Sequence, residues 1–380
     1  MYRHVLLPGR TVDRRQIAGG GDEDSDGPKV WGVESSRMFG MGVEKVTRVR
    51  VGLIGCGGIS RAHVPGYREL RDAGEVVAVA DVDRARAEER ARELGCGSVY
   101  ADYQEVLARS DVDAVDICLP HFLHAPVALA AIAAGKHVLV EKPIAVRLDE
   151  AEAMVSAADR AGVILQVGHN ERFEPQYQTM KEVLKERALG QVFSVRADHN
   201  QNVVLPPTHW LRDNASAGGG VVIGSAIHRL DLLRWLFGEP EDVFQVQTYL
   251  RDRLDGEVAA ITSLHFPGGI IAEVTSNWAV RHSPWNELLW IAGSEGSMHN
   301  IGGVHLDYAR RPECARGFVR LDGPAAGRGI SFIEEIRQFI QCARTGQRPL
   351  VDGAEGVSTL RLVLAAYRSA ELGRPVRLAD

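Results

Sequence analysis

The chain has 380 residues, which is too long for one ordinary hydrophobic core, so we expect two domains. Its 45% hydrophobic and 25% charged residues are ordinary for a globular protein, and its net charge of −6 excludes the basic surface that nucleic-acid binding requires. The sequence has no apolar run long enough to span a membrane, and its five cysteines show no zinc-type spacing. We therefore expect a cytoplasmic protein with no metal site and no nucleic-acid or membrane partner.

Residues 1–47 precede the regular part of the sequence. The run at 17–27 (IAGGGDEDSDG) is rich in glycine and acidic residues and can bury little apolar surface. A pair of arginines at 14–15 is not followed by the apolar segment of an export signal. We expect a disordered extension here.

Residues 48–168 alternate between short apolar runs and amphipathic segments. The apolar runs predict strands at 49–54, 75–80, 113–119, 137–140 and 163–167. The amphipathic segments predict helices at 60–71, 83–94, 125–134 and 149–161. Strands that alternate with helices form a parallel sheet covered on both faces. The pattern predicts an α/β fold with a Rossmann dinucleotide-binding domain at 48–168.

Residues 169–380 have longer strand patterns and fewer helices. Strands are predicted at 191–199, 242–251, 257–266, 270–278, 287–292 and 296–300, with helices at 175–187, 226–236, 331–344 and 355–371. The glycine turn at 267–269 joins two strands by a hairpin, which favours antiparallel pairing. We predict an α+β domain with a large, mainly antiparallel open sheet, whose last two helices can pack back on the first domain.

A glycine-rich turn follows the first predicted strand. Gly55 permits the tight turn, Gly57 and Gly58 let a pyrophosphate approach the backbone, and Ile59 and Ser60 open the next helix. Ser60 stands where the strict fingerprint has a third glycine, although it is small enough for close packing. Glycine-rich turns are common in proteins, so this motif indicates dinucleotide binding only when the residues around it agree.

The supporting residue is Asp81, an acid at the end of the second predicted strand. Asp81 can accept hydrogen bonds from the adenosine ribose hydroxyls and would repel a 2′-phosphate, which favours NAD over NADP. Arg84 lies close enough in sequence to tolerate that phosphate. The alternative role of Asp81 is to cap the helix that follows.

The run Glu141-Lys142-Pro143 follows the strand at 137–140, at the carboxyl edge of the sheet where open α/β folds bind ligands. A lysine at this edge can donate to a substrate hydroxyl and shift its proton equilibrium. Taken alone, a Lys-Pro pair after a strand is more typical of an exposed turn.

Together these motifs resemble the Gfo/Idh/MocA family of oxidoreductases, named after glucose-fructose oxidoreductase and inositol dehydrogenase. The resemblance covers about residues 48–378 and is carried by Gly55–Ser60, Leu119-Pro120 with His124, Ala134–Pro143, Asn170–Phe173, Gly218–Gly220 with His228 and Asp231, Gly293–Ser297, and Asp352-Gly353.

The resemblance implies roles for particular residues. Lys142 matches the family's lysine that contacts the reacting hydroxyl, and His228 matches its general acid/base. Pro120 and His124 match the segment that lines the nicotinamide, and Glu141 belongs to the same cofactor-side motif as Lys142.

One position departs from the family pattern. Many sugar and polyol dehydrogenases of the family have an aspartate four residues before the histidine, whereas this chain has Gly224. The carboxylate that would orient His228 or bind a second hydroxyl is therefore missing, which weakens an inositol-type assignment. We expect Asp231 to serve as a cap or salt bridge instead.

Three further residues are candidates for substrate contacts. Asn170 and Arg172 begin the second domain, and Arg172 either faces the cleft or forms a salt bridge between domains. Trp210 lies in a loop where it can stack on a sugar ring or merely anchor the loop. We interpret His199, His209 and His282 as structural, and expect Trp278 to make dimer contacts.

We predict an NAD(P)-dependent oxidoreductase that transfers hydride between nicotinamide and a hydroxyl or keto carbon of a sugar, polyol or related cyclic alcohol. The alternatives are an NAD-dependent glycosidase that uses transient oxidation and a non-catalytic cofactor-binding regulator. The resemblance implies a homodimer or homotetramer formed through the C-terminal sheet.

Overall fold

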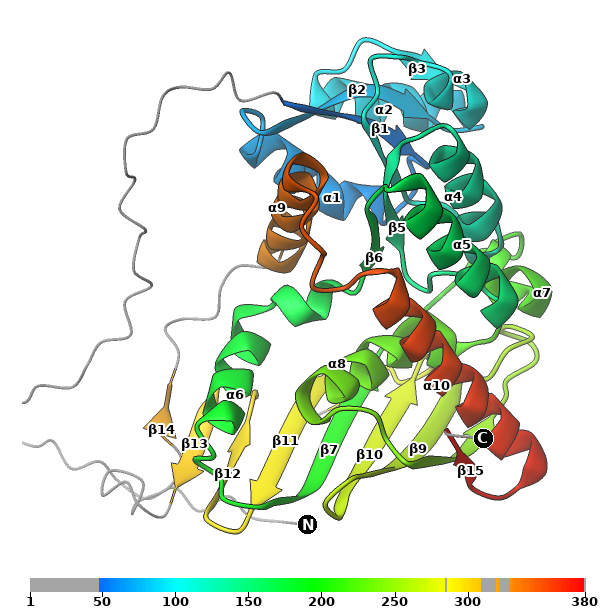
Figure 1. Cartoon of the computed structure of the whole chain (residues 1–380). Coiled ribbons are helices and arrows are strands. Elements are labelled where there is room, and N and C mark those ends of the chain that lie inside the picture. Colours follow the sequence, from blue (N-terminus) through cyan, green and yellow to red (C-terminus); the bar gives the residue numbers. More distant parts are fainter. Residues whose placement is uncertain (1–47, 284–285, 309–318, 322–328, 379–380) are drawn as a thin grey trace, which may run out of the picture. The chain divides into compact units, whose positions relative to one another are not determined.

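The computed structural model describes residues 48–283, 286–308, 319–321 and 329–378. The extension predicted at residues 1–47 lies outside these described residues. Two sheets and the helices around them make up the described part of the chain (Figure 1).

The first sheet contains six described strands, all paired in parallel. These are β1 (Val49–Ile54), β2 (Gly74–Ala80), β3 (Val99–Tyr100), β4 (Ala114–Ile117), β5 (His137–Glu141) and β6 (Leu165–Gly168), in the spatial order β3-β2-β1-β4-β5-β6. Every side chain of β4 and β6 is buried, as expected for strands covered on both faces. The strand order reverses between β1 and β4, so the crevice at their carboxyl ends is the expected ligand site.

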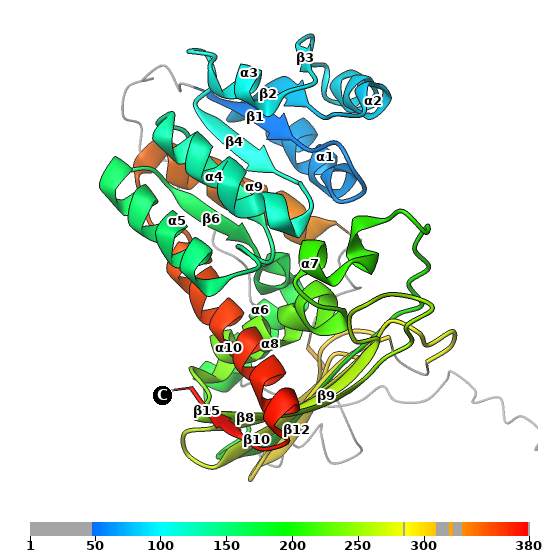
Figure 2. The ribbon, with the colours of Figure 1, turned by 90° about the vertical axis from the view of Figure 1, so that its right-hand side faces the viewer.

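Helices cover both faces of this sheet (Figure 2). They are α1 (Ser60–Glu69), α2 (Arg84–Leu94), α3 (Tyr103–Leu107), α4 (His124–Ala133) and α5 (Leu148–Ala161), with a short 3₁₀ turn η1 (His121–Leu123) before α4. The last but one helix, α9 (Ile330–Thr345), comes from the far end of the chain and packs against α1 through Ile336, Phe339 and Ile340. The Rossmann layer is thus completed by a helix that follows the second sheet in sequence.

The second sheet is mixed and has nine described strands. They are β7 (Val192–Asn200), β8 (Asp242–Thr248), β9 (Ala259–Phe266), β10 (Ile270–Asn277), β11 (Glu287–Gly293), β12 (Gly296–His299), β13 (His305–Tyr308), β14 (Val319–Arg320) and β15 (Val376–Arg377), in the order β14-β13-β12-β11-β7-β10-β9-β8-β15. The hairpin predicted around residues 267–269 joins β9 and β10. Among the described strands of this sheet, only β7 and β10 pair in parallel, so the prediction of a mainly antiparallel sheet is confirmed.

The remaining helices lie around this sheet and between the two layers. They are η2 (Asn170–Phe173), α6 (Pro175–Lys185), η3 (Trp210–Arg212), α7 (Asn214–Ala217), the π-helical turn η4 (Val222–Ala226), α8 (Ile227–Phe237) and α10 (Gly353–Leu372). Helix α10 contacts α5 and β6 as well as β8, so it joins the two layers (Figure 2). None of the helices in the described ranges is long and apolar enough to cross a membrane.

Candidate active site

The glycine turn lies between β1 and α1, as its sequence predicts. Gly55 has a φ of 93°, and a Cβ there would lie 2.4 Å from the Cys118 carbonyl oxygen, so only glycine fits. A Cβ on Gly57 or Gly58 would meet no atom within 4 Å, which leaves the space beside the turn open. The Ser60 hydroxyl donates to the Gly57 carbonyl oxygen at 2.8 Å and holds the turn closed. An open turn at the positive end of a ten-residue helix fits the pyrophosphate of a dinucleotide.

Asp81 sits beside this turn. One carboxylate oxygen accepts the Cys56 amide at 2.7 Å and the other accepts the Asp83 amide at 2.8 Å. Asp83, not Asp81, caps α2 by accepting from the Ala85 and Arg86 amides. The capping role is therefore already filled, and Asp81 is bound to the cofactor turn, the position that ribose recognition requires.

Lys142 follows β5 and reaches across to the second domain. Its Nζ donates to the Gly224 carbonyl oxygen at 2.7 Å. Burial lowers the pKa of Lys142, against the opposing effect of the Glu141 and Glu171 carboxylates. The lysine therefore does not occupy an exposed turn; its ammonium group lies where the carboxyl edge of the Rossmann sheet meets η4.

His228, in the first turn of α8, lies one helical turn after Gly224. Burial and then the charge of Lys142 lower the pKa of His228 well below its usual value, so at neutral pH the imidazole is uncharged and one ring nitrogen carries a lone pair. Its Nδ1 is buried and has no hydrogen-bond partner among the described residues. The structure therefore brings together the two residues predicted to carry the reaction.

Two more histidines surround His228, and sequence reasoning missed them. The ring centroids of His169 and His199 lie 6.3 and 6.4 Å from that of His228. Both are buried, and no ring nitrogen of either residue has a hydrogen-bond partner within the described ranges, although Nδ1 of His169 lies 3.9 Å from the Asp231 carboxylate. The interpretation of His199 as merely structural therefore misses its position beside the proposed base. The histidines follow β6 and end β7, so only the fold brings them together.

Trp278 occupies the place where a side chain at position 224 would lie. A Cβ on Gly224 would fall 2.4 Å from two carbons of the indole ring. The indole is 4% exposed, and its N–H donates to the Ser225 hydroxyl at 2.7 Å. The dimer contact predicted for Trp278 is wrong, because the ring is buried within its own chain. The carboxylate missing at Gly224 has been replaced by an aromatic wall, not by another acid at that position.

This packing predicts a cost for any side chain at position 224. Gly224→Ala should lower the free energy of unfolding by about 1–3 kcal/mol, because the hydrogen-bonded indole cannot move aside without strain. Urea denaturation measures the change. Gly97→Ala is the matched control, since a Cβ there meets nothing within 4 Å. Equal stability of the two variants would contradict the account of Trp278.

Arg172 does form a salt bridge, but its partners Asp231 and Glu355 lie in the same domain, so the expected bridge between domains is wrong; these contacts also speak against its predicted role at the substrate. Its guanidinium makes two 2.7 Å hydrogen bonds to Asp231 and one of 2.8 Å to Glu355, with the arginine and Asp231 both buried. Leu350 supplies a fourth acceptor, its carbonyl oxygen. These partners engage the guanidinium within the protein. The salt bridge expected for Asp231 is confirmed.

His124 and Glu141 also turn away from their predicted cofactor roles. The two ring nitrogens of His124 lie 2.6 Å from the Pro143 carbonyl oxygen and 2.8 Å from that of Leu119, and the ring is fully buried. The Glu141 carboxylate points into the core, where it meets His63 at 3.1 Å. Because both side chains are buried, neither can contact a ligand directly. Instead they hydrogen-bond to the backbone of neighbouring residues at the sheet edge.

The remaining candidates lie at the edges of the site. Pro120 precedes η1, and the next residue, His121, packs edge-on against Trp210 with ring centroids 4.6 Å apart. This contact brings the loop of Trp210 to the segment predicted to line the nicotinamide. Asn170 donates to the Ser331 hydroxyl at 3.0 Å. Two cofactor-side candidates extend outward: Ile59 is partly exposed, and Arg84 pairs with Glu88 on the surface.

These features are typical of a Rossmann-type dinucleotide-binding oxidoreductase. They are the strand order of the parallel sheet, the glycine turn beside an acid, and the lysine at the carboxyl edge. The description "Oxidoreductase family, NAD-binding Rossmann fold" matches residues 49–169, and the description "GFO/IDH/MocA C-terminal domain" matches residues 177–299. The chain belongs to the Gfo/Idh/MocA oxidoreductase family.

Relatives with known names support this membership along nearly the whole chain. D-apiose dehydrogenase of Paraburkholderia graminis is 30% identical over 359 residues, covering 91% of this chain and 94% of the relative. D-xylose 1-dehydrogenase (NADP(+)) 2 of Haloferax volcanii is 30% identical and covers 86% and 99%. A solved structure of levoglucosan dehydrogenase with NADH and levoglucosan has a TM-score of 0.81 at 25% identity, covering 88% of this chain and all of that one.

Proposed function

We propose that this protein is an NAD-dependent dehydrogenase that oxidises one hydroxyl of a sugar, polyol or related cyclic alcohol. The observation that carries the proposal is that Lys142 bonds to the Gly224 carbonyl oxygen, one helical turn before His228, and lies close enough to lower the pKa of that histidine. The names of the relatives, which include dehydrogenases of D-apiose and D-xylose, support the same class of substrate.

His228 and Lys142 have different roles in the proposed reaction. His228 accepts the hydroxyl proton, because its lowered pKa keeps the imidazole neutral in the free enzyme. Lys142, held by the Gly224 carbonyl oxygen, polarises the same oxygen and stabilises the charge that develops on it. The nicotinamide, when bound, supplies the hydride acceptor. The buried residues around this pair exclude water, which strengthens both electrostatic effects.

A substrate panel tests the proposal. The full chain is mixed with NAD or NADP and a set of pentoses, hexoses, anhydrosugars, inositols and nucleotide sugars, and absorbance at the NADH wavelength is followed. We expect net NADH formation with at least one cyclic alcohol. A glycosidase that recycles its cofactor would give sugar cleavage without net NADH, and a cofactor-binding regulator would give neither; both results would reject the proposal.

Asp81 is expected to set the preference for NAD. Asp81→Ser should lower the ratio of kcat/KM for NAD to that for NADP by about tenfold or more, because a carboxylate hydrogen bond to the ribose is lost and the repulsion of a 2′-phosphate is removed. Asp83→Ser is the control, since Asp83 caps α2 but does not touch the glycine turn. A ratio that falls equally in both variants would show that Asp81 acts only through the local fold.

The second sheet is proposed to form a homo-oligomer. On the outer face of this sheet, Val246 pairs with Ile261, and Ile271 lies on the same face of β10; the three side chains are 44–55% exposed. Neighbouring exposed apolar side chains mark interaction surfaces. Ile271→Glu should shift the mass measured by light scattering toward the monomer, whereas Ile301→Glu, on an exposed turn, should not.

A further inference from the structure

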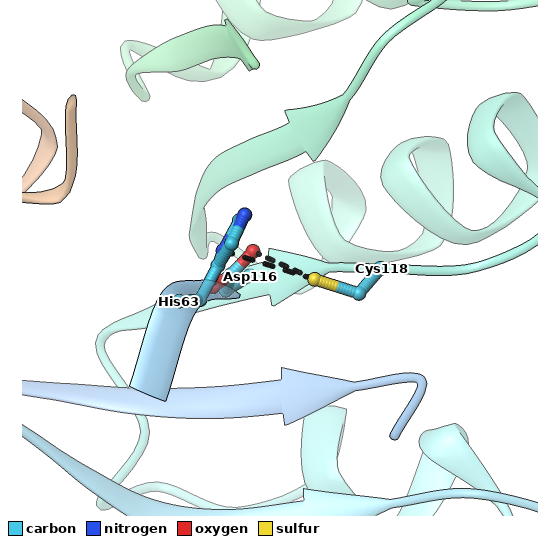
Figure 3. A group of neighbouring side chains, drawn as sticks. All are labelled: His63, Asp116 and Cys118. Carbon is cyan, nitrogen blue, oxygen red and sulfur yellow. Dashed lines mark hydrogen bonds and ion pairs between the residues drawn. The ribbon is translucent and has the colours of Figure 1, made fainter. Parts of the chain in front are cut away.

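A second polar cluster lies inside the Rossmann domain, away from the substrate side of Lys142. It consists of His63 on α1, Asp116 on β4, Glu141 on β5 and Glu335 on α9, and all four side chains are 5% exposed or less. Figure 3 shows His63 beside Asp116 of β4 and Cys118, which follows that strand. Burying three carboxylates and one imidazole costs free energy unless hydrogen bonds or opposite charges replace their lost hydration. Apolar neighbours provide neither.

One side of the imidazole is fully accounted for. The Nδ1 of His63 donates to the Asp116 carboxylate at 2.7 Å, and the Tyr67 hydroxyl donates to the same oxygen at 2.9 Å. Cys118 approaches from this side, with its sulfur 3.6 Å from Asp116 and 3.8 Å from Nδ1 (Figure 3). Because the Nδ1 proton is directed to Asp116, the lone pair available for a ligand is on Nε2.

On the other side Nε2 contacts Glu141, but a second carboxylate nearby has no hydrogen-bond partner among the described residues. Nε2 of His63 lies 3.1 Å from Oε1 of Glu141, and a Glu335 oxygen lies within 4.8 Å of both atoms. Glu335 is fully buried, yet neither of its carboxylate oxygens has a hydrogen-bond partner among the described residues. A buried carboxyl group without a partner is rare in folded proteins, and a bound ion is one of the explanations for it.

We propose that His63, Glu141 and Glu335 bind a divalent first-row transition-metal ion. A separation of 3.1 Å between Nε2 and Oε1 is that of two neighbouring ligands around an ion about 2.1 Å from each. The Asp116 carboxylate on Nδ1 is the outer partner that metal-binding histidines nearly always have. One imidazole with two carboxylates suits zinc, manganese or ferrous iron better than calcium or magnesium, which prefer oxygen ligands alone.

The alternative occupant is a pair of protons, one on Nε2 and one on Glu335. It gives the cluster the same net charge as one divalent ion with a neutral imidazole. The two states differ in hydrogen bonding: a protonated Glu335 needs an acceptor, and the described residues offer none within hydrogen-bond distance. A bound ion satisfies Glu335, Glu141 and Nε2 together, so the geometry favours the metal.

The site would also stabilise the catalytic strand end. The second oxygen of Glu141 accepts the backbone amide of Lys142 at 3.1 Å. An ion on Glu141 therefore ties the start of the Lys142 segment to α1 and α9. The role is structural, since the ligands are too buried to meet a substrate.

Metal analysis of the full-length protein tests the proposal. The wild-type chain is purified without chelator, and its metal content is measured by plasma mass spectrometry. It is then unfolded with EDTA and refolded with ZnCl₂, with MnCl₂ or without metal, and the melting temperature is recorded. We expect close to one equivalent of metal per chain and a melting temperature that rises by several degrees when Zn²⁺ or Mn²⁺ is present during refolding.

Glu335→Gln keeps the size of the side chain but removes a ligand, so it should lose both the bound metal and the metal-dependent rise. Glu334→Gln is the matched control on the same helix, because Glu334 pairs with Arg337 at the surface. Absence of metal from the wild type, together with a melting temperature that neither ion changes, would overturn the proposal. So would a Glu335→Gln protein that retains one equivalent of metal.

Discussion

Lys142→Ala is expected to lower kcat/KM for alcohol oxidation by about two to four orders of magnitude, while NAD binding changes little. A positioned proton-transfer or charge-stabilising group contributes this much in the transition state. The side chain is half-buried, and its Nζ is held by the Gly224 carbonyl oxygen. Steady-state kinetics on the substrate identified in the panel measures the loss of kcat/KM. Titration with NAD measures whether cofactor affinity is unchanged.

Two further variants are controls for the Lys142→Ala prediction. Lys185→Ala removes a surface lysine that pairs with Glu182, and it should leave kcat/KM unchanged. Lys142→Met retains most of the apolar stem, so it separates loss of the charge from loss of packing. Near-normal turnover in either Lys142 variant would remove that residue from the mechanism.

Asp231→Ala is expected to lower the free energy of unfolding by about 3–5 kcal/mol, the usual cost of leaving one buried charge without its partner. The carboxylate accepts two hydrogen bonds from Arg172 and one from Thr359 at 2.8 Å, and all three side chains are buried. Urea denaturation measures the effect. Glu355→Ala removes the other acidic partner of Arg172, which is 38% exposed, and should cost much less.

The pH dependence of the same pair has a definite sign. Burial would raise the pKa of Asp231, but the neighbouring His169 and Arg172 outweigh it and lower the pKa from 3.8 to about 2. A folded-state pKa below the unfolded value gives stability that is present above pH 3.8 and is lost only as the pH falls toward 2. The difference in stability between wild type and Asp231→Ala should therefore persist at pH 5. A difference that vanished there would contradict the ion pair.

Much of the fold followed from local patterns. The predicted strand at 75–80 and the predicted helix at 83–94 differ from β2 and α2 by one residue at one end, because burial on both faces and a charged helix surface leave clear patterns. Short elements such as β3 and β14 were missed, since two residues carry no periodicity. The π-helical turn η4 was missed as well; its backbone depends on contacts with Glu257 and Tyr367, far away in the chain.

The candidate site was predicted less evenly. Lys142 and His228 were assigned through their match to the family's motifs, and their roles in the reaction stay predictions. Arg172 was assigned to substrate as one of two alternatives, and the sequence could not choose between them. The choice depended on Asp231 and Glu355, whose spatial approach no local pattern encodes.

By itself, the sequence determined the nucleotide-binding architecture, because the periodicity of apolar residues and the glycine turn are properties of consecutive residues, and it marked Lys142 as the candidate lysine at the sheet edge. Only the tertiary structure decided what surrounds that lysine. Trp278 fills the space beside Gly224, and Glu335 reaches His63 from a helix near the end of the chain. These contacts join residues distant in sequence, and which of them meet is fixed by the packing of whole helices and strands.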